Sequence, residues 1–241
     1  MVTQMSLLGR SIVYWLGFAL STVLYSLISP VQYLFSDHTN SRIIRSWGTF
    51  NLWWLRVTCK ISYQVWGADN IPSNQAVVIL ANHQSTLETI LFPQIFPRMT
   101  WVLKQELLRI PSFGWGLRHT RPIAIDREEA RAALAQVKQQ GQQRLDDGIS
   151  VVIFPEGTRI EPDQHVEYKP GGALLAAGTG YPALPVAHNT GYFWPRHRFI
   201  KRPGIVTVSI GPLIPSQGVK AKSINEQAEQ WIEAERQRLP H

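Results

Sequence analysis

Cysteine and charge are both scarce in this chain of 241 residues. Cys59 is the only cysteine, so the chain can form neither an internal disulfide nor a cysteine-rich zinc site. Charged residues make up 17% of the sequence, against about 25% in typical soluble proteins. A surface this poor in charge is expected to meet lipid over part of its area.

The sequence also lacks the motifs of several common enzyme classes. It contains no H-E-x-x-H, no G-x-S-x-G and no Walker sequence, which argues against a zinc protease, a serine hydrolase and a P-loop enzyme. The histidines other than His83 show no metal-ligand spacing among themselves, so no metal site is expected.

The charge that is present is mostly positive, with a formal net charge of +7 at pH 7. This balance favours partners with negative charge, such as nucleic acid, anionic phospholipid or a phosphorylated substrate. Nine tryptophans favour the membrane, because indole rings prefer the boundary between hydrocarbon and water. The basic, aromatic run from Tyr192 to Arg202 suits lipid headgroups or an acidic carrier protein better than nucleic acid.

The first 60 residues predict a helical membrane anchor. No charge occurs from Ser11 to Ser36, and the stretch up to Ser29 would span about 28 Å as a helix, enough to cross a bilayer. Trp47 to Val57 is too short to span and predicts an interfacial helix that pairs with the first. The alternative is a pair of apolar helices buried in a soluble core.

If the first segment spans the membrane, charge sets its orientation. Four basic residues follow it before position 61, against one acidic residue, and the positive-inside rule then places the rest of the chain in the cytoplasm. The predicted location is therefore the inner, cytoplasmic membrane.

Residues 61–241 predict a second domain of the α/β class. Continuous apolar strands and intervening helices indicate a mixed, largely parallel sheet flanked by helices. A helix that packs on this sheet is predicted from Ala130 to Leu145. The predicted strands are Ile61–Trp66, Ala76–Ala81, Met99–Leu103, Pro122–Ile125, Ile149–Phe154, Ala183–Ala187 and Ile205–Ile210.

One candidate catalytic pair follows the predicted strand that ends at Ala81. His83 lies where the carboxyl end of a strand places ligands in α/β proteins, and Glu88 stands about one helical turn further on. A carboxylate at this spacing can fix the imidazole tautomer and stabilise the imidazolium. The competing interpretation is a capping box, in which Glu88 bonds the backbone of Ser85.

A second candidate segment is the loop from Pro155 to Arg159, which also follows a buried strand. Its glycine, hydroxyl group and guanidinium suit a phosphate. An ordinary turn with a solvated arginine explains the same letters equally well.

Taken together, these segments resemble the glycerolipid acyltransferases, the family that contains the 1-acylglycerol-3-phosphate acyltransferases. NHQSTLE is similar to the family's first motif, N-H-x4-D, and FPEGTR matches the third motif in full. Residues 123–127 resemble the second motif, with Arg127 at its basic position, and 183–186 resemble the fourth. One departure is that Glu88 stands where the family usually has Asp.

The resemblance implies direct transfer of a fatty acyl group from acyl-CoA or acyl-ACP to the free sn-2 hydroxyl of lysophosphatidic acid, which gives phosphatidic acid. It implies His83 as general base, Glu88 as its orienting group, and no cofactor beyond the acyl donor. The residues expected at the acceptor are Arg127 and Arg159 on its phosphate, Glu156, Gly157 and Thr158 around it, and Lys104, which either reaches the phosphate or is solvated.

Two further points stay open at this stage. Backbone amides at the start of the helix after His83 are candidates to stabilise the tetrahedral oxyanion. The alternatives in function are an acyltransferase for another lysophospholipid or lipid acceptor, and a non-catalytic lipid-binding protein in which the change to Glu88 has removed activity.

Overall fold

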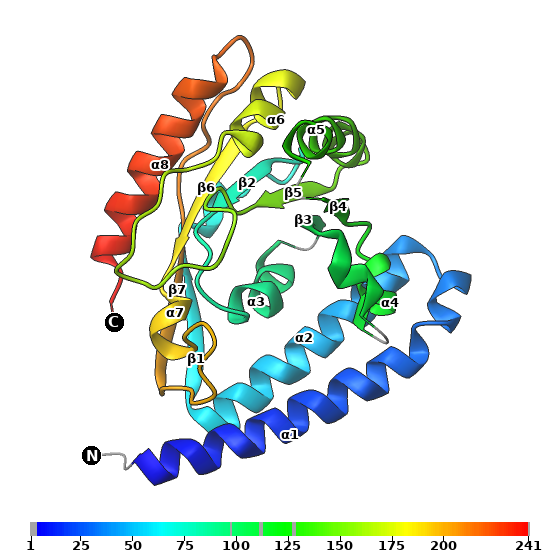
Figure 1. Cartoon of the computed structure of the whole chain (residues 1–241), viewed down its shortest axis with the longest axis vertical. Coiled ribbons are helices and arrows are strands. Elements are labelled where there is room, and N and C mark those ends of the chain that lie inside the picture. Colours follow the sequence, from blue (N-terminus) through cyan, green and yellow to red (C-terminus); the bar gives the residue numbers. More distant parts are fainter. Residues whose placement is uncertain (1–3, 97, 111–112, 127–128, 241) are drawn as a thin grey trace.

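The computed structural model describes residues 4–96, 98–110, 113–126 and 129–240. These residues form one seven-stranded sheet in the order β1-β7-β6-β2-β5-β3-β4, in which every pair is parallel except β6 with β7 (Figure 1). All seven predicted strands are confirmed, with ends shifted by at most two residues. The strands are β1 (Ile61–Trp66), β2 (Val78–Ala81), β3 (Met99–Lys104), β4 (Ile123–Ile125), β5 (Ser150–Ile153), β6 (Ala183–His188) and β7 (Gly204–Ile210).

Both faces of the sheet are covered by helices, which explains the continuous apolar runs of its central strands. Along β2, Ile79 packs into one core cluster, whereas Val78 and Leu80 pack into the other. The second cluster lies beneath α5 (Ala130–Asp146), α6 (Gly171–Thr179) and α8 (Ala221–Arg238). The first is covered by α3 (Leu87–Ile95), with α2 (Asp37–Cys59) and α1 (Gln4–Ile28) beyond it (Figure 1). The predicted packing helix is therefore α5.

Short helical turns complete the chain around this frame. They are η1 (Val31–Leu34), η2 (Ala68–Asn70), η3 (Gln105–Arg109), α4 (Phe113–Arg118) and α7 (Thr190–Phe193).

Helix α1 has the reverse of the usual amphipathic arrangement. It is long and apolar enough to cross a membrane, and its buried side chains are Ser11, Tyr14, Ser21 and Ser26. Ser21 bonds Asn51 of α2 at 3.3 Å. Its large aliphatic residues point outward instead, and the most exposed are Met5, Leu16, Leu20, Val23, Leu24 and Leu27. A soluble core would bury these side chains, so the structure favours the predicted anchor over the soluble-core alternative.

The anchor helices pack along each other and onto the rest of the molecule. α2 begins well before the predicted Trp47, with Ser36 as its N-cap, and Lys60 in the left-handed conformation connects it to β1. Near this same end of the pair, the Lys201 ammonium lies 3.9 Å from the Trp15 ring centroid and 4.3 Å from that of Trp194. The domain boundary at residue 60 stays a prediction, because helices on its two sides share one core.

We predict that the α1–α2 contact depends on the absence of a side chain at Gly17. A Cβ atom there would clash with the indole of Trp54, whose Nε1 donates to Val13 O at 3.2 Å. Gly17→Ala should lower stability by about 1–3 kcal/mol, as overpacking does. Gly9→Ala is the matched control, since a Cβ at Gly9 meets nothing within 4 Å. Thermal unfolding in detergent measures both, and equal midpoints would contradict the prediction.

Candidate active site

Three neighbouring strands bring the candidate residues together. β2 pairs in parallel with β5 on one side and with β6 on the other, so the carboxyl ends of all three meet at one edge of the sheet. His83 follows β2, Phe154 and Glu156 follow β5, and Thr190 follows β6. This edge is where ligands bind in open α/β sheets.

The predicted pair of His83 and Glu88 is formed. His83 Nδ1 lies 2.8 Å from Glu88 Oε1, and the imidazole stacks on Phe154 with ring centroids 4.0 Å apart and an interplanar angle of 8°. The His83 side chain is 14% exposed, whereas that of Glu88 is fully buried. The histidine can thus be reached from outside, and its carboxylate partner cannot.

The Glu88 carboxylate also makes the competing capping contact. Its Oε1 accepts from the backbone amides of Gln84 at 2.9 Å and Ser85 at 2.7 Å, and its Oε2 accepts from Thr190 Oγ1 at 2.8 Å. Both contacts that the sequence suggested are therefore present, because one oxygen bonds the imidazole and the helix start at once. Contacts from the loop after β2 and from the segment after β6 hold Glu88 and His83 in one geometry.

Electrostatics keep Glu88 ionised. Burial opposes its charge, but His188, His83 and the Ser85 amide outweigh burial and lower the Glu88 pKa to about 2. An ionised carboxylate only accepts, so His83 Nδ1 must carry the proton of their hydrogen bond. The other ring nitrogen, Nε2, is left as an acceptor, which is the state a general base requires.

His188 and Thr190 support this arrangement, and the sequence analysis assigned neither to the site. His188 is buried, and burial lowers its pKa to about 4 despite the nearby Glu88, so the ring is neutral at pH 7. Its Nε2 lies 2.7 Å from Asn82 O, and its Nδ1 lies 3.1 Å from Thr190 Oγ1. The signal in the sequence that could have placed them at the site is their position shortly after the predicted strand Ala183–Ala187.

Glu156 faces His83 from the next loop. Its carboxylate is buried, and Oε2 accepts a hydrogen bond from the His83 backbone amide. Burial raises the Glu156 pKa to about 8, while that amide and Arg236 act in the opposite direction. The side chain was expected to position the acceptor, but it is directed at the backbone of His83 instead.

The rest of this loop lies at the surface of the site. Gly157 has φ +73°, and a Cβ there would lie 2.8 Å from Lys169 Nζ, so both backbone conformation and space favour glycine. Thr158 is exposed. Arg159 is half-buried, and its Nε finds no hydrogen-bond partner in the described part of the chain. A buried guanidinium N–H without a protein partner can be satisfied by a bound ion or water.

The remaining expectations have mixed outcomes. Lys104 is exposed at the end of β3, which neighbours β5 at the same edge of the sheet. Arg127 lies outside the described residues. The amides of Gln84 and Ser85 already donate to Glu88, and the expectation that backbone amides at the helix start bind the oxyanion stays a prediction. Among the described residues no group of His, Cys, Asp or Glu could hold a metal ion.

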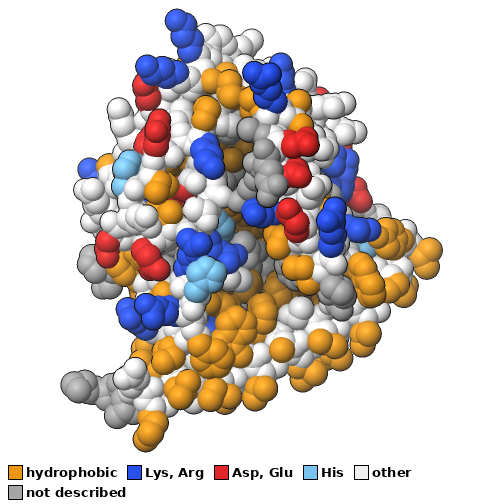
Figure 2. All heavy atoms as spheres, viewed as in Figure 1, with side chains coloured by type: hydrophobic (Ala, Val, Ile, Leu, Met, Phe, Trp, Pro, Cys, Tyr) orange, Lys and Arg blue, Asp and Glu red, His pale blue; other side chains and the backbone are white. Residues whose placement is uncertain are grey.

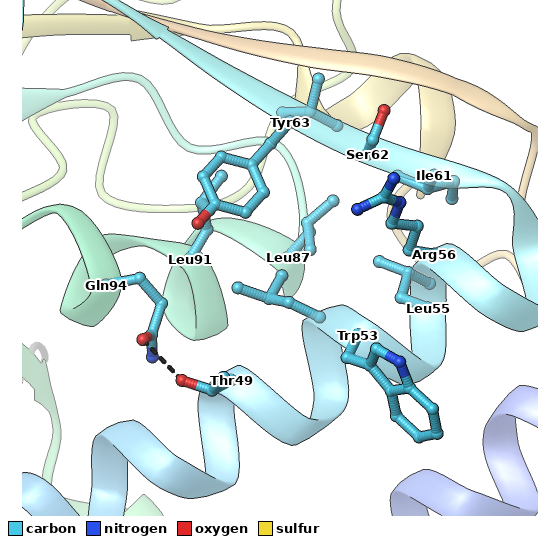
Figure 3. A pocket seen from close by; sticks show the side chains of 12 residues that line it. Thr49, Trp53, Leu55, Arg56, Ile61, Ser62, Tyr63, Leu87, Leu91 and Gln94 are labelled. Atoms are coloured by element: carbon cyan, nitrogen blue, oxygen red, sulfur yellow. Dashed lines mark hydrogen bonds between the residues drawn. The ribbon is translucent and has the colours of Figure 1, made fainter.

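A separate recess of about 260 Å³ lies between α2, α3 and β1. Figure 3 shows Arg56 and Ser62 at one end of the recess. Leu87 and Leu91 of α3 line it, together with leucines of α2. His83 is not among its lining residues. In helix α3, Leu87 thus faces the recess and Glu88 faces His83.

The geometry suits one class of enzyme: a buried carboxylate bonds a partly exposed histidine beside an arginine-bearing loop, with an apolar recess and a long apolar helix in the same structure. The model of the Acyltransferase family matches residues 62–189, more than half of the chain, and the chain belongs to this family. It is an acyltransferase.

Individual relatives narrow the comparison. The 1-acyl-sn-glycerol-3-phosphate acyltransferase of Pseudomonas aeruginosa is 43% identical over 193 residues, which are 79% of this chain and 75% of that protein. The human 1-acyl-sn-glycerol-3-phosphate acyltransferase alpha is 29% identical over 163 residues, 66% of this chain and 57% of that protein. The crystal structure of the lysophosphatidic acid acyltransferase PlsC from Thermotoga maritima shares the fold, with a TM-score of 0.71, 24% identity and coverage of 93% and 97%.

We predict that Glu88→Gln leaves a folded but nearly inactive protein. The amide keeps the shape, but it neither holds the Nδ1–H tautomer nor stabilises the imidazolium, so kcat should fall by about 10³–10⁴-fold, as in other carboxylate-oriented histidines. Glu226→Gln, on the exposed part of α8, is the control and should keep full turnover. Near-normal kcat in Glu88→Gln would show that the carboxylate has only its capping role.

Proposed function

We propose that the chain transfers a fatty acyl group from acyl-CoA or acyl-ACP to the sn-2 hydroxyl of lysophosphatidic acid, giving phosphatidic acid, with His83 as general base. The observation that carries the proposal is the ionised, buried Glu88, which directs the proton to Nδ1 and leaves Nε2 as an acceptor. The names of the Pseudomonas and human relatives support this acceptor.

The proposed step conserves one proton throughout. His83 Nε2 takes the acceptor's hydroxyl proton while the oxygen attacks the thioester carbonyl, and Glu88 stabilises the imidazolium that forms. Collapse of the tetrahedral intermediate breaks the C–S bond, and the imidazolium returns its proton to the leaving thiolate. No acyl-enzyme is required, so Cys59, which is buried, has no role as a nucleophile.

Charge and apolar space near His83 suit the two ends of a lysophospholipid. The unpartnered Nε of Arg159 can donate to a phosphate oxygen, and Lys104 is proposed to add charge at the same sheet edge. Arg127 keeps the phosphate-binding role that the family resemblance implies. The recess beside α3 suits a hydrocarbon chain, because half of the residues that line it are aliphatic.

The outer face of α1 supports a location of this site at the lipid surface. Figure 2 shows hydrophobic side chains along the edge that α1 forms, with basic side chains next to them. Contacts near the middle of α1 and just after its last residue join it to the catalytic part: Trp15 Nε1 donates to Phe199 O at 3.2 Å, and His119 Nε2 lies 3.1 Å from Ser29 O. We therefore propose that α1 lies along the membrane with its outer face in lipid, and that the catalytic part faces the cytoplasm.

Removing the imidazole tests the mechanism. We expect His83→Ala to abolish formation of phosphatidic acid from a thioester and lysophosphatidic acid, because no other described group replaces the base. Flotation with liposomes should be unchanged, since α1 is untouched. Product is measured by mass spectrometry. Turnover that survives in this variant rules out His83 as the base.

Arg159 tests the phosphate contact. We expect Arg159→Ala to raise the KM for lysophosphatidic acid by about tenfold or more, the loss of one charge-assisted hydrogen bond, with a smaller change in kcat. Arg131→Ala, an exposed arginine of α5, should change neither constant. An unchanged acceptor KM in Arg159→Ala would exclude the contact.

A screen of acceptors and donors in purified membranes separates the proposal from its nearest alternative. Lysophosphatidic acid should be acylated faster than lysolipids whose phosphate carries a headgroup. A preference for another lysophospholipid or lipid acceptor would assign the chain to that substrate, and comparison of acyl-CoA with acyl-ACP identifies the donor.

A further inference from the structure

Arg236 is a buried arginine near the end of α8, and the proposed reaction gives it no task. Its side chain is 7% exposed, although arginines usually reach solvent. Nη1 lies 2.6 Å from Glu233 Oε1, and Nη2 donates to the carbonyls of Pro162 at 2.6 Å and Gln164 at 3.0 Å. The guanidinium thus ties the chain that follows the FPEGTR loop to the last helix.

The same guanidinium faces the loop's carboxylate. Arg236 Nη1 lies 4.0 Å from Glu156 Oε1, an oxygen that has no hydrogen-bond partner among the described residues. The other oxygen of Glu156 accepts from the backbone amide of His83. A continuous series of contacts therefore runs from α8 through Arg236 and Glu156 to the residue that carries the imidazole.

Several charged or titratable groups act on the Glu156 carboxylate. Burial disfavours its charge most, Glu233 on α8 and Glu88 on α3 repel it, and Arg236 attracts it. Tyr168 is also close, but its hydroxyl donates to Glu233 Oε1 at 2.9 Å, and burial raises its pKa so that it stays neutral. Removing the cation would disfavour the charged form of this buried carboxyl group still further and so favour its protonated form.

We propose that Arg236 is a positioning residue for this acyltransferase: it holds the Glu156 carboxylate and the following loop in place, and Glu156 in turn fixes the backbone of His83. The kinetic part of this proposal rests on the function proposed above. Loss of Arg236 should misplace His83 slightly without removing any group that touches substrate, and a shift of about 1 Å in such a group can cost about 100-fold in rate.

The kinetic test compares Arg236→Met with Arg238→Met. Arg238 is on the same helix but is 77% exposed and pairs only loosely with Glu235 at 3.8 Å. We expect Arg236→Met to lower kcat by about tenfold or more with little change in the acceptor KM, and Arg238→Met to match the parent protein. Equal kinetics in the two variants would overturn the proposal.

The pH profile separates positioning from a general loss of structure. Removing the positive charge raises the Glu156 pKa further. Because the proposal has the ionised carboxylate hold the His83 amide, full activity should then require a higher pH. The acidic limb of the kcat profile should therefore move to higher pH. Arg236→Lys keeps the charge but not the fork that binds two carbonyls, and it should return the limb toward the parent position. A limb at the same pH in Arg236→Met would count against the coupling.

A double-mutant cycle with Glu156→Gln tests whether Arg236 acts through Glu156. Once Glu156 has lost its charge, Arg236→Met should cost little more, so the two losses should be far from additive. Fully additive losses would mean that Arg236 acts by another route.

A nuclear magnetic resonance titration tests the coupling without catalysis. The His83 amide donates to Glu156, so in protein labelled with ¹⁵N-histidine its shift reports the ionisation of Glu156, and His83→Ala assigns the signal. Arg236→Met should move the midpoint to higher pH. Glu233→Gln removes a charge that repels the Glu156 carboxylate, so it should move the midpoint to lower pH. This variant provides the test if Arg236→Met does not fold. Midpoints that do not move overturn the coupling, whether or not lysophosphatidic acid is the acceptor.

Discussion

The buried carboxylate of Glu88 is the constraint on which the rest of the site depends. A charge without exposure to solvent persists only when donors surround it, and this carboxylate has four: the His83 ring, two backbone amides and the Thr190 hydroxyl. They come from the loop after β2 and from the segment after β6. The sheet must therefore bring β2 and β6 side by side before the base can be oriented, and the parallel pairing of these strands does so.

Two buried glutamates act on the same histidine in different ways. Glu88 has enough donors to hold its pKa well below the usual value, whereas burial dominates at Glu156 and raises its pKa. The first carboxylate bonds the ring of His83 and the second bonds its backbone amide. One glutamate thereby sets the tautomer and the other sets the position. The distinction depends on the number of donors around each carboxylate, since the residue type is the same.

The membrane anchor is part of the same structure. α1 turns its serines inward and its leucines outward, and it reaches the segment after β6 through Trp15, Trp194 and Lys201. That segment also carries Thr190, which bonds Glu88. The outer face of α1 and the pair of His83 and Glu88 are therefore linked by a short stretch of chain.

The apolar pattern of the sequence determined the strands, the packing helix and the anchor, because burial of apolar side chains follows periods that can be read locally. Motif spacing also located His83, Glu88 and the loop at Arg159, although a capping box explained Glu88 equally well. Only the tertiary structure showed that the Glu88 carboxylate bonds both the His83 ring and the Ser85 amide. It also showed that the Gln84 amide donates to the same carboxylate, and that His188, Thr190 and Arg236 complete the site. Those contacts join residues more than 70 positions apart, and no local pattern encodes which distant side chain will satisfy a buried charge.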